Sequence, residues 1–227
     1  MHVLLFDIDG TLIHTRGSGT IALRQGFLEA FGCEAPTKID LCGRTDRAIA
    51  SELLQACGVP DTLTNWHRFH QAYLRHLAVQ LPLGVGQVLP GVEAVLHDVS
   101  SDADIAIGIL TGNTPEGAGI KLGHFGLAHH FHFGGYGHEH EDRRVVAEAA
   151  LAAARQRLNG RLHLDRVWVI GDTPRDIVCA RHIGARSVAV ATGFFDRDDL
   201  AAQRPDVLLD DFLQAGHWLA CLDGGVA

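Results

Sequence analysis

The spacing of apolar residues in an early part of the chain differs from the spacing in the rest of it. Between residues 20 and 81, apolar residues recur at spacings of three and four, which is typical of amphipathic helices. This pattern predicts three helices, at Ile21–Phe31, Thr45–Cys57 and Leu63–Leu81. Glycine-rich joints at 17–19 and 82–86 flank the block. We therefore expect an all-helical unit inserted between two flexible connections.

The rest of the chain alternates short apolar runs with amphipathic segments. The runs predict strands at Val3–Phe6, Ile105–Leu110, Phe131–Phe133, Val167–Ile170, Ser187–Ala191 and Val207–Leu209. Helices are expected between them, at Glu116–Phe125, Arg143–Leu158 and Arg175–Ile183, with a last one through Trp218. Strands that are apolar throughout and separated by helices form parallel sheets covered on both faces. We predict an α/β fold of that kind.

Two aspartates, Asp7 and Asp9, directly follow the first predicted strand. Side chains spaced i, i+2 at a strand end point the same way, so the two carboxylates repel each other and favour a divalent cation. Gly10 and Thr11 then turn the chain away from the sheet. An aspartate can also attack phosphorus as a covalent nucleophile. The alternative is a pair of turn-forming aspartates without a chemical role.

Two further predicted strands end in polar residues, namely Thr111, Gly112 and Asn113 after one strand and Asp172 after the other. At both places a threonine followed by proline begins the next helix, which suits a helix cap. The free N–H groups of such helix starts favour a phosphate. Turn and capping chemistry explains each residue singly. Because the carboxyl ends of parallel strands meet at one edge, we predict one site for a cation and a phosphate.

These motifs resemble those of the haloacid dehalogenase-like (HAD) phosphohydrolases, and the similarity spans nearly the whole chain. The first motif corresponds to Asp7 through Leu12, the second to Thr111, and the fourth to Gly171 through Asp176. The segment Gly43–Arg47 resembles the cap loop of phosphoglycolate phosphatase-like members. The resemblance implies a Rossmann-like core formed by residues 1–16 and 87–227 and an inserted helical cap at residues 17–86.

The resemblance also implies an activity, that of a Mg²⁺-dependent phosphatase acting on a small organic phosphate monoester. Asp7 is then the nucleophile that forms an aspartyl-phosphate, and Asp9 is the general acid and base. Mg²⁺ is held by Asp7, the backbone carbonyl of Asp9 and Asp172, while Asp176 supports the loop. The phosphate is bound by residues of the first two motifs, namely Gly10, Thr11, Thr111, Gly112 and Asn113.

The chain departs from the family at the third motif, where a lysine is usual. Neither of its two lysines lies in that stretch, and Lys121 is expected on the surface of its helix. Arg143 is our choice as the phosphate clamp over Arg144, because an arginine can bind two phosphate oxygens at once. In the cap loop, Arg44 is expected to reach the organic part of the substrate. The alternative for Arg44 is a solvated arginine at the start of a capped helix.

Five histidines crowd the segment 129–140, namely His129, His130, His132, His138 and His140. Histidine is the commonest metal ligand, but this spacing matches no tight ligand pattern. We expect loop or surface histidines here, with a substrate contact from His138 or His140 as the second interpretation.

Composition limits the classes of partner. The 227 residues carry a formal net charge of −8, which disfavours nucleic acid and anionic membranes. The five cysteines show no CxxC pair and are expected to be reduced thiols. The first residues lead directly into a strand, and no apolar stretch reaches the roughly 20 residues of a membrane helix. We expect a cytoplasmic protein whose partner is a small phosphorylated metabolite, of open oligomeric state.

Two other functions stay open at this point. A sugar phosphomutase would use the same aspartyl-phosphate but return the phosphoryl group to a sugar. A non-catalytic HAD-fold protein would keep the fold for binding or regulation. The missing lysine of the third motif favours this second alternative, whereas the intact Asp7, Asp9, Thr111 and Asp172 disfavour it.

Overall fold

The computed structural model describes residues 1–36 and 38–222, and its centre is a six-stranded sheet in the order β5-β4-β1-β6-β7-β8. The strands are β1 (His2–Phe6), β4 (Ile105–Thr111), β5 (Gly134–Tyr136), β6 (Val167–Gly171), β7 (Arg186–Val190) and β8 (Val207–Leu209). Every pairing is parallel; Leu4, for example, lies opposite Ile107 on one side and Trp168 on the other. The predicted α/β fold with a parallel sheet is confirmed.

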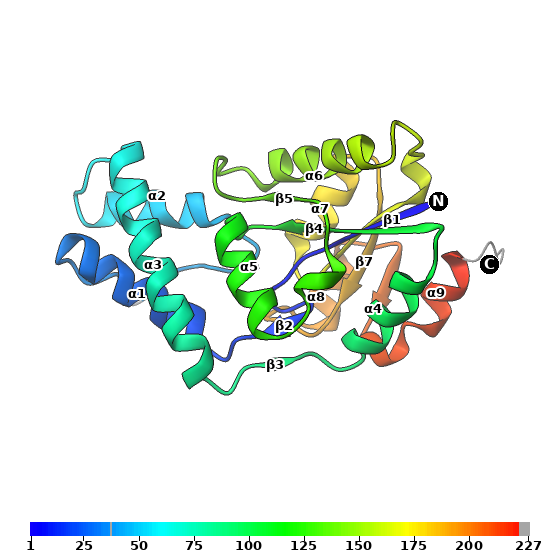
Figure 1. The fold of residues 1–227 in the computed structure, drawn as a ribbon, viewed down its shortest axis with the longest axis horizontal. Helices are drawn as coiled ribbons and strands as arrows, with labels where there is room; N and C mark the ends of the chain where they lie inside the picture. Colours follow the sequence, from blue (N-terminus) through cyan, green and yellow to red (C-terminus); the bar gives the residue numbers. More distant parts are fainter. Residues whose placement is uncertain (37, 223–227) are drawn as a thin grey trace.

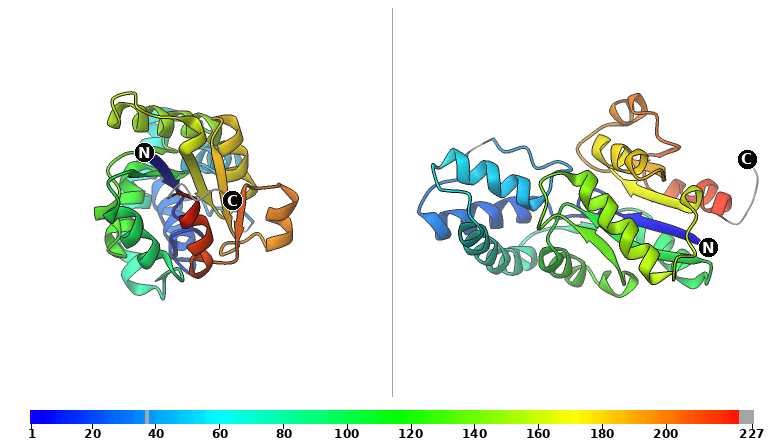
Figure 2. Two further views of the ribbon diagram at one scale, coloured as in Figure 1. Left: turned by 90° about the vertical axis from the view of Figure 1, so that its right-hand side faces the viewer. Right: turned by 90° about the horizontal axis from the view of Figure 1, so that it is seen from above.

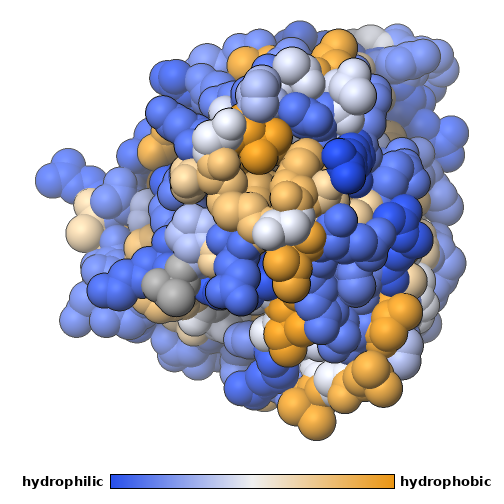
Figure 3. Space-filling model, turned by 90° about the vertical axis from the view of Figure 1, so that its left-hand side faces the viewer, coloured by the Kyte–Doolittle hydropathy of each residue, from blue (hydrophilic) through white to orange (hydrophobic). Residues whose placement is uncertain are grey.

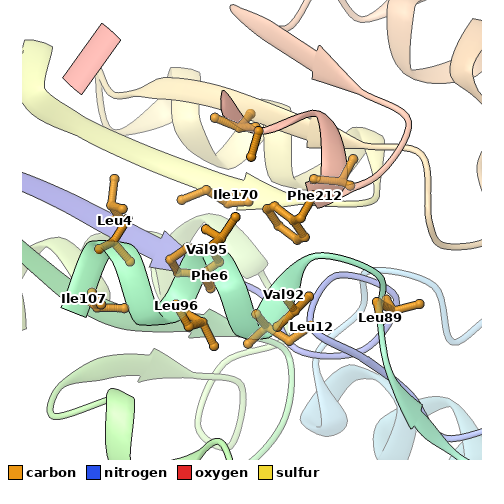
Figure 4. Packing of buried hydrophobic residues seen from close by; sticks show 14 of the residues in the cluster. Leu4, Phe6, Leu12, Leu89, Val92, Val95, Leu96, Ile107, Ile170 and Phe212 are labelled. Atoms are coloured by element: carbon orange, nitrogen blue, oxygen red, sulfur yellow. The ribbon is translucent and has the colours of Figure 1, made fainter. Parts of the chain in front are cut away.

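Helices cover both faces of the sheet (Figures 1 and 2). Leu4 and Phe6 belong to one hydrophobic cluster and Val3 and Leu5 to another, because neighbouring strand residues point to opposite faces. The first cluster includes α4 (Val92–Ser101), α5 (Pro115–His124) and α9 (Gly216–Leu222), and Figure 4 shows part of it. The second includes α6 (Arg143–Arg157) and α7 (Pro174–His182), while α8 (Arg197–Ala202) packs at the β7 side. Burying each large apolar side chain contributes roughly 1.5–3 kcal/mol.

Three helices form a separate layer at the end of the molecule opposite the N-terminus (Figures 1 and 2). They are α1 (Ser18–Phe31), α2 (Asp46–Ala56) and α3 (Leu63–Leu83), and they share a hydrophobic cluster that includes Phe27, Leu53 and Phe69. We call residues 17–86 the cap, following the predicted boundaries. The chain enters and leaves it through β2 (Ile13–His14) and β3 (Gln87–Val88), which pair antiparallel. The outer face of the cap is mainly hydrophilic, with apolar areas between (Figure 3).

The structure differs from the sequence prediction at several elements. The helices α4 and α8 and the short pair β2–β3 were not predicted, although Val92, Val95, Leu96 and Val99 follow helical spacing. The strand predicted at Phe131–Phe133 lies at Gly134–Tyr136. Glycine is unfavourable in strands, but a Cβ on Gly135 would lie only 2.3 Å from the carbonyl oxygen of Val146. Close packing of α6 on β5 therefore requires glycine at position 135, the same residue type whose low strand propensity argued against a strand here.

The cysteines are not all reduced. Cys33 and Cys57 form a disulfide, whereas Cys42, Cys179 and Cys221 are free thiols. The expectation of five reduced cysteines is therefore wrong for one pair. The two partners are 24 residues apart in sequence, and packing of the ends of α1 and α2 brings them together. Within the described residues, no helix combines the length and apolar character that crossing a bilayer demands.

Candidate active site

The carboxyl ends of β1, β4 and β6 meet at the edge of the sheet that faces the cap (Figure 1). β1 is followed by Asp7 and Asp9, β4 ends at Thr111, and β6 is followed by Asp172. All four residues line one cavity of about 500 Å³, whose other walls come from the cap and from further residues of the core. The structure thus gathers the strand-end residues around a single space.

Three carboxylates lie close together in this region. Asp7, Asp172 and Asp176 are buried, and each offers an oxygen within 4.8 Å of the others. Burial raises the pKa of Asp172 well above its usual range, and the charges of Asp176 and Asp7 raise it further. Burial also raises the pKa of Asp7, against the opposing charge of Arg143. The positively charged side chains around this cluster therefore do not fully offset the negative charge of its carboxylates.

Arg143 is the cation within this cluster. Its Nη2 lies 2.8 Å from Asp7 Oδ2 and 2.7 Å from Asp176 Oδ1, and its side chain is only 6% exposed. Asp142 caps α6 by accepting the backbone N–H of Arg144, whose side chain forms an ion pair with the same carboxylate at the surface. Of the two candidate arginines, the structure therefore places Arg143 against Asp7 and Arg144 away from it.

The donor set of the cluster fits a divalent cation. Mg²⁺ prefers carboxylate and other oxygen ligands, and here three carboxylates face one guanidinium. Thr11 Oγ1 donates to Asp172 Oδ1 at 3.1 Å and orients that carboxylate. Gly10, with φ +82°, leaves it room, because a Cβ there would lie 2.3 Å from Asp172 Oδ2. Across residues 1–36 and 38–222, no other group of three histidine, cysteine or acidic side chains comes this close.

The side chain of Asp9 lies outside that cluster and contacts Lys121. Lys121 Nζ donates to Asp9 Oδ2 at 2.6 Å and to Asn113 Oδ1 at 2.7 Å, and Asn113 Nδ2 donates to Asp9 Oδ2 at 2.8 Å. Burial alone would raise the pKa of Asp9, but the Lys121 ammonium and these hydrogen bonds outweigh it and lower the pKa. The expectation that Lys121 lies on the surface is wrong, because the residue is 5% exposed.

Thr111 and Asn113 shape the end of β4. Thr111 Oγ1 accepts hydrogen bonds from Asn113 Nδ2 at 2.9 Å and from Asn113 N at 3.3 Å. Two accepted bonds leave the proton of the Thr111 hydroxyl free to donate. Thr114 then caps α5 by accepting the N–H of Gly117, and Pro115 occupies the first turn, as the sequence predicts. The site therefore gains a fixed hydroxyl donor beside an amide and an ammonium group.

The cap loop is hydrogen-bonded directly to the core. Asp46 N donates to the carbonyl of Gly112 at 2.7 Å, and Asp46 Oδ2 accepts the N–H of Thr114 at 2.9 Å. Arg47 N donates to the carbonyl of Gly137 at 3.1 Å. A Cβ on Gly112 would lie 1.9 Å from the carbonyl oxygen of Arg44, so only glycine permits this approach. These contacts close the cap over the strand ends.

Known proteins resemble this chain along most of its length. A family model described as HAD-hydrolase-like matches residues 144–215. A phosphoglycolate phosphatase from Synechococcus elongatus is 28% identical, covering 95% of this chain and 97% of the relative. Another from Rhodospirillum rubrum is 29% identical, covering 95% and 90%. The solved structure of CbbY from Rhodobacter sphaeroides in complex with phosphate matches with a TM-score of 0.75 at 18% identity, covering 95% and 96%.

A haloacid dehalogenase-like family protein from Streptococcus pneumoniae matches with a TM-score of 0.66 at 19% identity, covering 96% of this chain and 98% of that one. The chain is thus similar to haloacid dehalogenase-like (HAD) hydrolases. In this chain, the strand-end motifs at Asp7, Thr111 and Asp172 surround the cavity. Asp176 accepts hydrogen bonds from Thr173 N at 3.0 Å and Thr173 Oγ1 at 2.7 Å, so its carboxylate ties the loop after β6 to α7.

Lys121 is the site residue that the sequence prediction missed. The signal was present, because Lys121 follows the helix cap Thr114 by seven residues, which is two helical turns. Residues at that spacing lie on one face of a helix, so the lysine side chain returns toward the start of α5. Because no lysine lies in the stretch of the third motif, the sequence prediction assigned the cation of the site to an arginine.

Arg44 lines the cavity, but its guanidinium is engaged within the cap. Nη1 contacts the Glu52 carboxylate and donates to the carbonyl of Asp40 at 3.1 Å, and Nη2 donates to the carbonyl of Ala48 at 3.2 Å. The histidines of the segment 129–140 do not line this cavity. His129, His130 and His132 border a different cavity, beside the start of β4.

Binding of Mg²⁺ should stabilise the folded protein, because it relieves repulsion among buried carboxylates. At a concentration about ten times its Kd, a ligand specific to the folded state adds about 1.4 kcal/mol, or a rise of roughly 3–5 °C in Tm for a chain of this size. We expect this rise in a thermal melt with MgCl₂ and its loss in the variant Asp172→Asn. An equal rise in wild type and variant would place the cation elsewhere.

The cap residue Asp46 should make stability depend on pH. Burial raises its pKa to about 6, against the opposing charge of Lys121. Between the unfolded pKa of about 3.9 and pH 6, only the folded state keeps this proton, so its contribution to stability falls as pH rises and is constant above pH 6. The variant Asp46→Asn cannot ionise at this position. Its free energy of unfolding should therefore rise relative to that of the wild type by about 1 kcal/mol between these pH values, a modest amount because partial exposure screens the charge. Urea denaturation of both proteins from pH 4 to pH 8 measures the difference in their free energies of unfolding. A difference that stays constant over this pH range would contradict the prediction.

Proposed function

We propose that the protein is a cytoplasmic, Mg²⁺-dependent phosphatase that hydrolyses a small organic phosphate monoester through an aspartyl-phosphate on Asp7. The observation that carries this proposal is the surroundings of Asp7. Its carboxylate lines a cavity together with Asp9, Thr111 and Asp172 and contacts Arg143 at 2.8 Å. A nucleophile, a proton carrier and anion-binding groups thus converge on one space. The names of the curated relatives support the same reaction class.

In the first step, an oxygen of Asp7 attacks phosphorus while the bond from phosphorus to the leaving oxygen breaks. Asp9 takes up a proton when the anionic ester binds beside it, because a nearby negative charge raises its pKa, and it gives this proton to the leaving oxygen, so that an alcohol departs. In the second step, water attacks the phosphorus of the aspartyl-phosphate and Asp9 takes up a proton of the water. The bond between phosphorus and Asp7 then breaks, which releases inorganic phosphate and restores both aspartates.

Attack by a carboxylate on a phosphate ester brings two anions together, so positive charge must offset the repulsion. Mg²⁺, held by Asp7, Asp172 and the Asp9 carbonyl, would supply electrostatic stabilisation to the phosphoryl oxygens. Arg143 positions Asp7 and contributes its charge. Lys121 and the hydroxyl proton of Thr111 are placed to bind phosphoryl oxygens. Gly10, Thr11 and the backbone of Gly112 and Asn113 complete the phosphate-binding turns.

Closure of the cap would exclude bulk water from the first step. The hydrogen bonds of Asp46 to Gly112 and Thr114 hold the cap loop on the core, and His70 Nε2 lies 2.9 Å from Thr114 Oγ1. A water-poor site strengthens the charge interactions among the catalytic groups. Opening at the paired strands β2 and β3 would admit substrate and release products.

The direct test is the release of inorganic phosphate from para-nitrophenyl phosphate by the purified protein with MgCl₂. We expect turnover that disappears on chelation and returns when Mg²⁺ is restored. A broad panel of phosphate esters without any metal-dependent turnover would contradict the proposal. If turnover required a sugar bisphosphate and transferred the group to a sugar, the protein would be a phosphomutase.

A further inference from the structure

The cap side of the active-site cavity has an unusual charge balance, because none of its described residues offers a substrate an uncompensated positive charge. We propose, on the basis of the phosphatase function above, that the substrate is the phosphate ester of an uncharged, partly apolar alcohol. By the same argument, esters whose alcohol bears a carboxylate, such as phosphoglycolate, are poor substrates.

In the described part of the chain, the arginine and lysine residues that line the cavity are Arg44 on the cap side and Lys121 and Arg143 on the core side. Arg44 contacts Glu52, which offsets its charge. Arg143 pairs with Asp7 and Asp176. Lys121 donates to Asp9 and Asn113, and the proposed reaction uses its remaining N–H for a phosphoryl oxygen. These ion pairs would have to break before any of the three cations could meet a carboxylate of the substrate with its full charge.

Among the described residues that line the cavity, His14 is the remaining basic residue near the cap side. Its Nδ1 accepts the backbone N–H of Arg16 at 2.9 Å. This hydrogen bond holds the ring and leaves Nε2 as the nitrogen that can meet a hydroxyl or carbonyl group.

A negative charge lines the same part of the cavity. Asp46 borders it, and its Oδ2 accepts the N–H of Thr114 at the edge of the site. At pH 7.5 this carboxylate is ionised in most molecules, because its pKa is about 6. A carboxylate on the leaving alcohol would face Asp46, whereas Lys121, the cation that acts on Asp46, is already paired with Asp9. Like charges that approach each other in a partly enclosed site oppose binding.

Much of the remaining cap-side surface is apolar. Leu23, Leu41, Ile49 and Tyr73 line the cavity from α1, the loop before α2, α2 and α3. On the core side, Phe194 also lines it, although 82% of this residue is exposed. An exposed aromatic ring at a cavity wall offers a contact surface to an apolar group.

The size of the cavity agrees with this class of substrate. Its volume of about 500 Å³ lies within the range of roughly 300–1,000 Å³ that holds ligands of drug size. A two-carbon acid such as glycolate would leave most of the apolar wall uncovered. The relatives named phosphoglycolate phosphatase share less than a third of their residues with this chain, which leaves room for a different specificity.

The test compares matched esters that differ in one carboxylate. Phosphoglycolate is paired with hydroxyethyl phosphate, and para-carboxyphenyl phosphate with phenyl phosphate, at pH 7.5 with MgCl₂. We expect kcat/KM to be at least about tenfold higher for the uncharged member of each pair, and highest for phenyl phosphate. Equal values, or a preference for phosphoglycolate, would overturn the inference.

Two variants test the cause of the preference independently. Asp46→Asn removes the negative charge, and Glu52→Gln frees the charge of Arg44. Each should raise the ratio of kcat/KM for the carboxylate ester over its uncharged partner by about tenfold. The exposed Asp165→Asn, remote from the cavity, should leave the ratio unchanged. An unchanged ratio in both test variants would contradict this role of the two charges.

The two proposals fail in different ways. If no ester of either pair releases phosphate, the phosphatase function is wrong. If esters are hydrolysed but carboxylate-bearing ones are preferred, the phosphatase function stands and only the substrate class is wrong.

Discussion

Replacing the proposed nucleophile, Asp7→Asn, should abolish turnover, with kcat reduced by at least about 10⁴-fold. An amide has no charged oxygen with which to attack phosphorus, so the aspartyl-phosphate cannot form. The buried Arg143 would also lose one of its two carboxylate partners, although its contact to Asp176 remains. Phosphate release from para-nitrophenyl phosphate under saturating Mg²⁺ measures the loss.

A matched control separates chemistry from folding in this experiment. Asp165→Asn makes the same chemical change at an exposed position and should retain wild-type turnover and Tm. In the wild type, beryllofluoride should form an adduct on Asp7 in the presence of Mg²⁺, and the variant should form none. Turnover above about a hundredth of the wild-type rate in a well-folded Asp7→Asn variant would point to direct attack by water.

The fold and the core of the site could be predicted because they depend on local patterns. Continuous apolar runs marked β1, β4 and β6, and the carboxyl ends of parallel strands necessarily lie at one edge. The positions of Asp7, Thr111 and Asp172 after these runs therefore placed them together without any knowledge of distances. The capping threonines Thr114 and Thr173 belong to the same class of local signals.

Features that depend on contacts between distant segments could not be predicted in this way. The disulfide between Cys33 and Cys57 requires the ends of two helices to meet. The pairing of Arg44 with Glu52 depends on how the cap loop folds back over α2. Local propensity argued against a strand at the glycine-rich β5. A strand forms there because glycine allows α6 to pack closely on it.

Lys121 shows how a missing motif can mislead when position in sequence is taken as position in space. The usual lysine of the third motif is absent, yet the cavity still contains an ammonium group, which arrives from α5 instead. Arg143 in turn contacts Asp7 and pairs with Asp176. Two cations from separate helices thus contact the two aspartates that follow β1, Arg143 at Asp7 and Lys121 at Asp9.

Replacing this lysine, Lys121→Met, should lower kcat by about 10³-fold, since a preorganised donor inside a closed site contributes strongly to stabilising the transition state. Methionine keeps the apolar stem but removes the charge that faces Asp9 and Asn113. The exposed Lys38, the only other lysine of the chain, provides the matched control, and Lys38→Met should behave as wild type.

The pH–rate profile distinguishes this role of Lys121 from a merely structural one. The Lys121 ammonium lowers the pKa of Asp9 against the effect of burial, so its removal should let that pKa rise. The limb of the profile governed by Asp9 should then move to higher pH in Lys121→Met, whereas a general loss of folded protein would lower the whole profile without moving it. A variant with reduced kcat and an unmoved profile would show that Lys121 acts through packing alone, and an unchanged kcat would remove it from the catalytic machinery.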